Sequence, residues 1–567
     1  MKVRLGMLLC LVPLLISARL FGQNSADHAA VEVAAKVIRP EEIRAHIRFL
    51  ADSLLQGRAP GTPGYDIAAR YVATELEGMG LDPGAGGWFQ PVPLENAVTD
   101  AAASSLVLTV NGKEQKLVDA KDYVLSTWFA NPAAKGKTKA DADVSGPVVF
   151  VGFGVTAPNQ KYDDYADVDV HGKLVLSIYG APSAFPSTER AYYSDGIVKA
   201  KNAVAHGAVG VLSIMLPEDW KRYPWEWLVP QIQVGEMHWL DKNGTPHDFL
   251  PELRGNALFS EHGAELLFAG APRTLDQVLT TARAGKPQAF PLPVTAHLHT
   301  VATQNVIQSS NIVAELKGSD PKLRDQYVVY TAHVDHLGIC PPVDGDNVCH
   351  GALDNASGTS TLLEIARAYS RLPQPPRRSV LFVFVTGEEM GLLGSDYFAH
   401  FPTVPLKSIV ANVNIDGAPG SYFPMKDVVA LGAEHSSLAN EVASAAKEMG
   451  YDVSPDPMPE EVSFIRSDQY SFVLQGVPAV NVEDGVKSTD AKIDGLAVIK
   501  KWLVTRYHTP LDNMDQPIDF VSAAKGAVMN FLVGYEVAQH DANPTWNRGD
   551  FFGTTFGPRH SRVGTGE

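Results

Sequence analysis

The chain has little positive charge, and this shortage narrows the classes of partner that it can bind. Its 567 residues include 47 lysines and arginines against 64 aspartates and glutamates, a formal net charge of −17. Phosphate binding needs a basic surface, so this balance argues against nucleic acid as a partner. Total charge mainly reports solubility, and it does not identify the substrate.

Two common hydrolase motifs are also missing. The sequence contains no H-E-x-x-H, which argues against a thermolysin-like metalloprotease. It contains no G-x-S-x-G nucleophile elbow either, which argues against a serine hydrolase of that type. With 45% hydrophobic and 20% charged residues, the composition is that of an ordinary globular protein, and the length predicts two or three domains.

Long apolar runs are scarce as well, and the one clear example lies at the N-terminus. A basic start (MKVR) precedes the run from Leu5 to Ile16, which is too short to span a bilayer comfortably. This pattern predicts a signal peptide over 1–22, with cleavage after Ala18 or Gly22, and a secreted or periplasmic protein. An uncleaved anchor is the alternative. After signal cleavage we expect no stable membrane insertion.

Six potential ligand or proton-transfer residues lie in the second half of the chain, and most of them follow apolar runs. The runs QYVVYTA, SVLFVFVT, SIVANVNI and GVPAVNV predict β-strands, and the carboxyl ends of strands in an open α/β sheet converge at one site. Imidazole mixed with carboxylate suits zinc, and two adjacent acids allow one to bind metal while the other handles protons. The six residues are His333, Asp354, Glu388, Glu389, Asp416 and His508.

The segments HVDHLG, GALDNASG, TGEEMGLLGS and YHTPLDN resemble the M28 metallopeptidases, a family of co-catalytic zinc exopeptidases, over about His46 to Glu536. The resemblance implies a mixed, mostly parallel sheet flanked by helices, and two zinc ions per chain. It also implies a role for each of the six residues. Asp354 would bridge both metals, His333 and Asp416 would complete one site, Glu389 and His508 would complete the other, and Glu388 would be the general base.

The same resemblance assigns further positions. Asp335 would hold the ring of His333 from behind, and the Asp354–Asn355 peptide bond would be cis. Tyr507 would donate a hydrogen bond to the developing oxyanion, although a packed aromatic role is equally compatible with its sequence. Arg466 and Asp468 match a segment that lines the substrate site. We expect His336 and His350 to be polar residues at the rim.

These features predict a secreted exopeptidase that cleaves peptide substrates at a chain terminus through a metal-bridged hydroxide. An aminopeptidase is the favoured form. A carboxypeptidase or dipeptidase with the same metal site is an alternative, because the choice depends on which charge meets the substrate terminus. A catalytically inactive binding protein of this fold is a second alternative, disfavoured because all five metal ligands are present. The single-zinc glutaminyl cyclases are disfavoured because His333 accompanies Asp416. The oligomeric state is open.

Apart from Cys10 in the leader, the chain has two cysteines, Cys340 and Cys349, which lie between His333 and Asp354. An even pair in an exported protein indicates a disulfide, here one that orders a loop beside the site. Free thiols are the alternative. A zinc clip built on this pair lacks the usual four ligands.

The catalytic domain is predicted in two parts, 40–101 and 304–540, separated by an insertion over 102–294. Short β-runs and turns dominate the insertion, which resembles the protease-associated (PA) domain in FVGFGVTAPNQKYDDYADVDVHGKLVL and KAKNAVAHGAVGVL. A lid or spacer with no chemistry and a part in substrate selection are both open as its role. The last segment, 543–567, lacks periodicity and is expected to be a flexible tail.

Overall fold

The computed structural model of the chain describes residues 29–127, 138–285 and 287–561. The predicted signal peptide over 1–22 lies outside these residues. Among the helices in the described ranges, none combines the length and the apolar character that a membrane span requires.

A mixed sheet forms the centre of what we call the main lobe, which comprises α2 (Pro40–Leu50), α3 (Pro63–Gly78) and residues 311–561. Its neighbouring strands are, in order, the end of β13, then β17, β14, β18, β21, β19 and β20. Four neighbouring strands, β17, β14, β18 and β21, are parallel to one another. They are buried on both faces, as expected for uninterrupted apolar runs between layers of helices. The strand bounds are β14 Tyr327–His333, β17 Ser379–Val385, β18 Ile409–Asn414, β19 Asp427–Leu431, β20 Asp452–Ser454 and β21 Ala479–Asp484.

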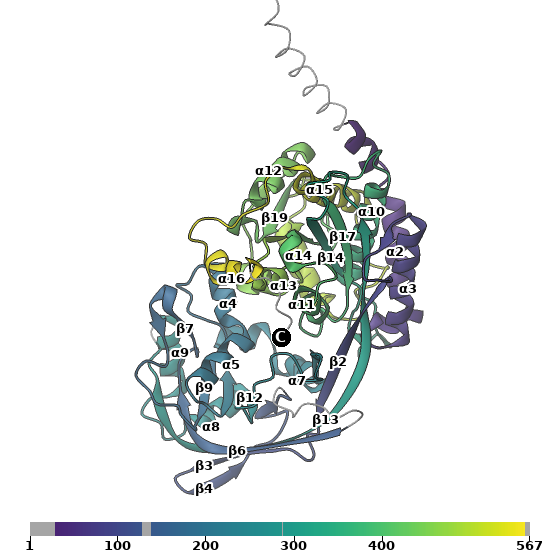
Figure 1. Cartoon of the computed structure of the whole chain (residues 1–567). Helices are drawn as coiled ribbons and strands as arrows, with labels where there is room; N and C mark the ends of the chain where they lie inside the picture. The colour runs from purple at the N-terminus through teal and green to yellow at the C-terminus, as the bar shows by residue number, and fades with distance from the viewer. Residues whose placement is uncertain (1–28, 128–137, 286, 562–567) are drawn as a thin grey trace, which may run out of the picture.

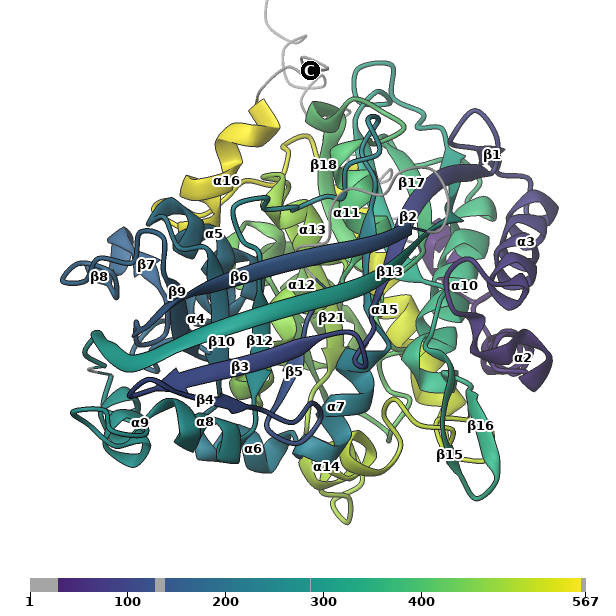
Figure 2. The ribbon, with the colours of Figure 1, turned by 90° about the horizontal axis from the view of Figure 1, so that it is seen from below.

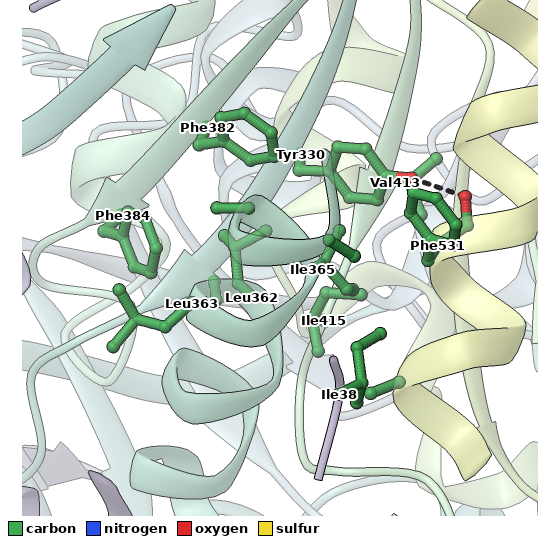
Figure 3. Close-up of a cluster of buried hydrophobic side chains, with 14 of the residues drawn as sticks. Ile38, Tyr330, Leu362, Leu363, Ile365, Phe382, Phe384, Val413, Ile415 and Phe531 are labelled. Carbon is green, nitrogen blue, oxygen red and sulfur yellow. Dashed lines mark hydrogen bonds between the residues drawn. The ribbon is translucent and has the colours of Figure 1, made fainter. Parts of the chain in front are cut away.

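Helices cover both faces of this sheet (Figure 1). The larger core lies on one face, where Leu362 and Leu363 of α10 and Phe531 of α15 pack against Tyr330 and Phe382 of the strands (Figure 3). The Tyr330 hydroxyl donates to backbone carbonyls of α15, which satisfies its polar end inside the core. The helices are α2 Pro40–Leu50, α3 Pro63–Gly78, α10 Gly358–Ser370, α11 Leu393–His400, α12 Leu438–Met449, α13 Gln469–Leu474, α14 Gly495–Thr505, α15 Phe520–Gln539 and α16 Phe551–Ser561.

Two long strands, β2 (Phe89–Thr99) and β13 (Phe290–Leu316), run from the main lobe into a second lobe (Figures 1 and 2). They pair with each other antiparallel from Phe89–Ile312 to Thr99–Ala302. At about 3.3 Å per residue, the 27 residues of β13 are long enough to serve both lobes. The chain therefore leaves the main lobe and returns to it along one continuous ribbon.

The second lobe, which we call the intervening lobe, comprises residues 105–294 and has apolar cores of its own. It contains the parallel strands β6, β9, β10 and β12, and also several helices. Its elements are β3 Ser105–Val110, β4 Lys113–Lys116, β5 Tyr123–Leu125, β6 Thr138–Phe150, β7 Thr156–Ala157, β8 Tyr162–Asp163, β9 Leu174–Ile178, β10 Gly210–Ile214, β11 Glu236–Trp239, β12 Asn256–Phe259, α4 Ser187–Ser194, α5 Gly196–Ala205, α6 Pro217–Arg222, α7 Trp225–Gln233, α8 Glu261–Leu267 and α9 Leu275–Arg283.

The C-terminal segment corrects one prediction. Residues 543–567 were expected to form a flexible tail, but Phe551–Ser561 is the helix α16. Phe552 and Phe556 are 0% and 3% exposed, and they pack in the smaller core of the main lobe and against Tyr192 of the intervening lobe. Burial of these rings stabilises a helix whose glycines and Pro558 disfavour it locally, so the sequence pattern alone did not reveal it.

Candidate metal centre

The predicted ligands meet at one edge of the main sheet. His333 is the last residue of β14, Glu388 and Glu389 follow β17, and Asp416 follows β18. These strands are parallel neighbours, so their carboxyl ends lie together, as the general rule for open α/β sheets requires. The sheet topology therefore brings together residues separated by more than eighty positions in the sequence.

The first half of the site surrounds His333, which is completely buried. Its Nε2 atom lies 3.5 Å from Asp354 Oδ1 and 3.5 Å from Asp416 Oδ1. Glu388 Oε2 is slightly farther from the same nitrogen, at 3.7 Å. One imidazole nitrogen thus faces three carboxylates.

The second half of the site surrounds His508. Its Nε2 atom lies 3.3 Å from Asp354 Oδ2 and 3.0 Å from Glu389 Oε2. Asp354 therefore presents one carboxylate oxygen to each histidine, and it stands between the two halves. This is the geometry that a carboxylate bridging two cations needs.

The arrangement of these nitrogen and oxygen atoms suits bound metal ions better than hydrogen bonds among the side chains. The Nε2 atoms of His333 and His508 are both buried without a hydrogen-bond partner among the described residues, although carboxylate oxygens lie close to each. Two sets of three side chains, His333 with Asp354 and Glu389, and His333 with Glu388 and Asp416, offer ligand atoms within 4.8 Å of one another. Imidazole nitrogen and carboxylate oxygen are zinc ligands, so the residues present fit that ion.

The adjacent glutamates have opposite electrostatic environments. Burial, with the charges of Asp416 and Glu389, raises the pKa of Glu388 well above its usual range, although His333 opposes this. Burial acts the same way on Glu389, but His508 and His336 outweigh it and hold the pKa of Glu389 well below its usual range. Of the pair, Glu388 thus favours holding a proton and Glu389 favours the charged form that a ligand requires.

Asp335 positions the two glutamates as well as the first histidine. Its carboxylate accepts the backbone N–H of Glu388 (3.3 Å) and that of Glu389 (3.4 Å). His333 Nδ1 lies 3.3 Å from the Asp335 backbone carbonyl and 3.9 Å from its carboxylate. The contact to the ring is therefore made mainly by the backbone of Asp335, while its side chain fixes the turn after β17.

Asp512, in the YHTPLDN segment, fixes the backbone of the central carboxylate. It is fully buried, and it accepts the backbone N–H groups of Leu353 (3.0 and 3.2 Å) and Asp354 (3.0 Å). The Asp354–Asn355 peptide bond is cis, which confirms the expectation from the resemblance. The α-helix α10 begins after this turn, at Gly358.

The expectation for His336 and His350 was wrong, because neither is a rim residue. His336 is 0% exposed, and its Nδ1 atom hydrogen-bonds with Glu389 Oε1. His350 is 6% exposed and lies between the Ala51 carbonyl and Asp346. Both rings are buried because the turn at 51–58 and Arg58 pack over this segment.

Tyr507 lies beside the metal centre, and its ring stacks on His508 at a centroid distance of 3.7 Å. The hydroxyl accepts a hydrogen bond from Arg466 Nη2 (3.2 Å). Burial raises the pKa of Tyr507 well above its usual range, so the hydroxyl keeps its proton. Asp468, which follows in the same segment, is fully buried and close enough to His333 to interact electrostatically with it.

Cys340 and Cys349 are joined by a disulfide that closes the hairpin β15 (Gly338–Val343) and β16 (Asp346–Cys349). The hairpin packs against residues 53–58, and the carbonyls of Gly338 and Cys349 lie next to Gly57. Gly57 has a φ of +71° and no room for a Cβ, so this close approach requires glycine.

Comparison with known proteins agrees with this geometry. Residues 311–529 match the model of peptidase family M28. This range contains all the site residues named above, apart from the residues near 57 that contact the hairpin. Aminopeptidase YwaD of Bacillus subtilis (strain 168) is 28% identical over 214 residues, or 36% of this chain and 40% of that protein. A probable glutamate carboxypeptidase of Arabidopsis thaliana is 26% identical over 460 residues, or 75% of this chain and 63% of that protein.

Among solved structures, an aminopeptidase from Aneurinibacillus sp. strain AM-1 has a TM-score of 0.51 at 19% identity, covering 89% of this chain and 95% of that one. This likeness shows the fold, a mixed sheet between helices. The aligned segments span 40% or less of the length of the first three curated relatives. Residues 311–529 of the chain are thus similar to peptidase family M28.

Proposed function

We propose that the protein is an exported zinc-dependent exopeptidase, with two zinc ions per chain, that acts as an aminopeptidase. The observation that supports it best is the pair of buried Nε2 atoms without hydrogen-bond partners, each facing one oxygen of Asp354. His333, Asp354 and Asp416 would hold one ion, and Asp354, Glu389 and His508 the other. The similarity to aminopeptidase YwaD, 28% identical over 36% of this chain, supports the choice of reaction.

When bound, the two ions would lower the pKa of a water molecule and polarise the substrate carbonyl. Glu388 is the residue to accept the proton, because it lies beside His333 without being needed as a ligand and its environment favours protonation. It would then deliver that proton to the leaving amine. Tyr507, held by Arg466, would donate its O–H to the oxygen that becomes negative during attack. Asp335 would keep Glu388 in place through its backbone N–H.

We further propose that the intervening lobe is a PA-type domain that covers the substrate side of the site. Contacts between the lobes support this role: Arg190 and Arg222 donate to the carbonyls of Pro459 and Glu460, a few residues before Arg466. Export is proposed from the N-terminal sequence pattern.

A carboxypeptidase or dipeptidase that uses the same residues is the second candidate. The similarity to a probable glutamate carboxypeptidase over 75% of the chain favours it. Arg466 is a cation beside the site that suits a substrate carboxylate. A catalytically inactive binding protein is less compatible with the complete ligand set.

One cleavage experiment separates these candidates. The mature protein with zinc is incubated with one peptide in three forms: free at both ends, acetylated at the N-terminus, and amidated at the C-terminus. An aminopeptidase cleaves the first and third forms, and mass spectrometry finds residues lost from the N-terminus. Cleavage of the first and second forms alone would establish a carboxypeptidase, and no cleavage of any form would contradict the proposed enzyme.

A further inference from the structure

A second group of possible metal ligands lies where the two lobes meet, and it shares no residue with the metal centre. His247 belongs to the intervening lobe, in the segment between β11 and β12. Asp396 and His400 lie on α11 of the main lobe, which packs against β11. Their spacing of four positions places both side chains on one face of the helix. One possible ligand atom from each of the three lies within 4.8 Å of the others, and we call these residues the interlobe trio.

The Asp396 carboxylate stands between the two imidazole rings. His247 Nε2 lies 3.3 Å from Asp396 Oδ2, and His400 Nδ1 lies 3.3 Å from Asp396 Oδ1. Zinc bonds to imidazole nitrogen and carboxylate oxygen are about 2.0–2.2 Å long, so two ligands of one tetrahedral ion lie roughly 3.3–3.6 Å apart. The spacing of the interlobe trio therefore suits a shared ion.

Neighbouring side chains hold the interlobe trio in this arrangement. Trp239 Nε1 donates to Asp396 Oδ2 (2.7 Å), and the His247 ring stacks on the Trp239 indole at a centroid distance of 4.0 Å. On the other side, Gln475 Nε2 donates to His400 Nε2 (3.2 Å), which leaves Nδ1 facing Asp396. Such outer contacts orient the ligands of a metal site before the ion binds.

The donor atoms also determine which kind of ion fits. Imidazole suits zinc and similar transition metals, whereas calcium and magnesium require mostly oxygen ligands. A second carboxylate adds negative charge, since Asp248 Oδ2 lies 3.5 Å from His247 Nε2, although its other oxygen pairs with Lys201 (2.7 Å). Two imidazoles beside these carboxylates therefore favour zinc over calcium.

We propose that His247, Asp396 and His400 form a third zinc site, separate from the metal centre, which joins the intervening lobe to α11. A water molecule would complete a tetrahedral set of ligands. The site would tie the intervening lobe to the segment that follows the catalytic pair, because α11 begins four residues after Glu389. This inference does not depend on the proposed peptidase activity.

The interlobe trio should bind zinc more weakly than the metal centre. Its histidine side chains are 28% and 29% exposed, and it provides three protein ligands without a bridging carboxylate. In addition, His400 Nδ1 donates to the Asp396 backbone carbonyl (2.8 Å), so a zinc ion that binds this nitrogen has to displace its proton. Dialysis against zinc-free buffer should therefore empty this site, and free zinc should fill it again.

The test is the zinc content at equilibrium with free zinc, measured by mass spectrometry of the metal. We expect the wild-type protein to hold one more zinc ion per chain than His247→Gln or His400→Gln. The difference is used rather than the total, so the result is independent of the occupancy of the metal centre. The control His540→Gln should keep the wild-type content, because His540 pairs with Glu441 (3.0 Å) but belongs to no trio of ligands among the described residues.

A second measurement uses the wild-type protein alone. Zinc should protect His247 and His400 together from modification by diethyl pyrocarbonate, mapped by mass spectrometry of peptides, while the exposed His540 stays reactive. Equal zinc content in the wild-type protein and both variants, loss of zinc in only one variant, or equal modification with and without zinc would overturn the inference. Calcium in place of zinc should produce no difference between the wild-type protein and the variants, and a difference of one calcium ion would contradict the assignment to zinc.

Discussion

Asp512 provides a sharp test of how the metal centre is held, because it contacts the backbone of the bridging residue and none of the proposed metals. In Asp512→Ala, the N–H groups of Leu353 and Asp354 lose the acceptor that now lies 3.0 Å from each. Leaving a buried donor unsatisfied costs about 1–3 kcal/mol, so two such groups should lower the free energy of unfolding by about 2–6 kcal/mol. Loss of a residue that orients a ligand also typically weakens metal affinity about 10–100-fold.

Two assays measure these effects separately. Urea unfolding of the metal-free protein gives the change in stability, and competition with a chelator gives zinc affinity. Asp512→Asn should lose less in both, because the amide oxygen can still accept one of the backbone N–H groups. The matched control is Asp490→Ala, since Asp490 also accepts a backbone N–H, from Lys492 at 3.0 Å, but is exposed. If Asp512→Ala matches the Asp490→Ala control in stability and in zinc affinity, the reasoning about Asp512 is wrong.

Three further predictions concern the catalytic pair, the hairpin and the C-terminal helix. Glu388→Gln should keep two zinc ions and lower kcat by about 10²–10⁴-fold. Glu389→Ala should lose zinc, and added metal should partly restore its turnover. The reverse pattern of metal content would exchange the roles of the two residues. Cys340→Ser with Cys349→Ser should lower the free energy of unfolding by about 2.5 kcal/mol, the chain-entropy value for so short a loop, and alkylation of both thiols in the unreduced wild-type protein would disprove the bond. Phe552→Ala should lower the free energy of unfolding in urea by about 3–5 kcal/mol, because that ring is fully buried. The control Val504→Ala, at an exposed position, should lower it little. Equally small effects of the two substitutions would contradict the packing of α16 and support a loose C-terminal segment.

Much of the site could be predicted from the sequence because its ligands lie at strand ends. The apolar runs before His333 and Glu388 and around Asp416 marked strands, and the rule that parallel strands converge at their carboxyl ends then placed these residues together. Family motifs supplied His508 and the cis peptide, whose positions no periodicity reveals. Local pattern was therefore informative where a ligand directly follows a buried strand.

The parts that the sequence did not reveal depend on contacts between distant segments. His336 is buried because residues 51–58 pack over it, and nothing in HVDHLG distinguishes it from an exposed loop residue. The helix α16 has glycines and a proline, and it becomes stable through the burial of Phe552 and Phe556. Burial and register are properties of the folded chain, and they carry little local signature.

The zinc content of active protein tests the central claim most directly. Purified mature protein is dialysed against zinc-free buffer, and its metal content is measured by mass spectrometry alongside hydrolysis of a peptide with free ends. The account predicts two zinc ions per chain, loss of hydrolysis when a chelator removes them, and its return when zinc is restored. Full hydrolysis by zinc-free protein, or active protein that binds fewer than two metal ions per chain, would contradict it.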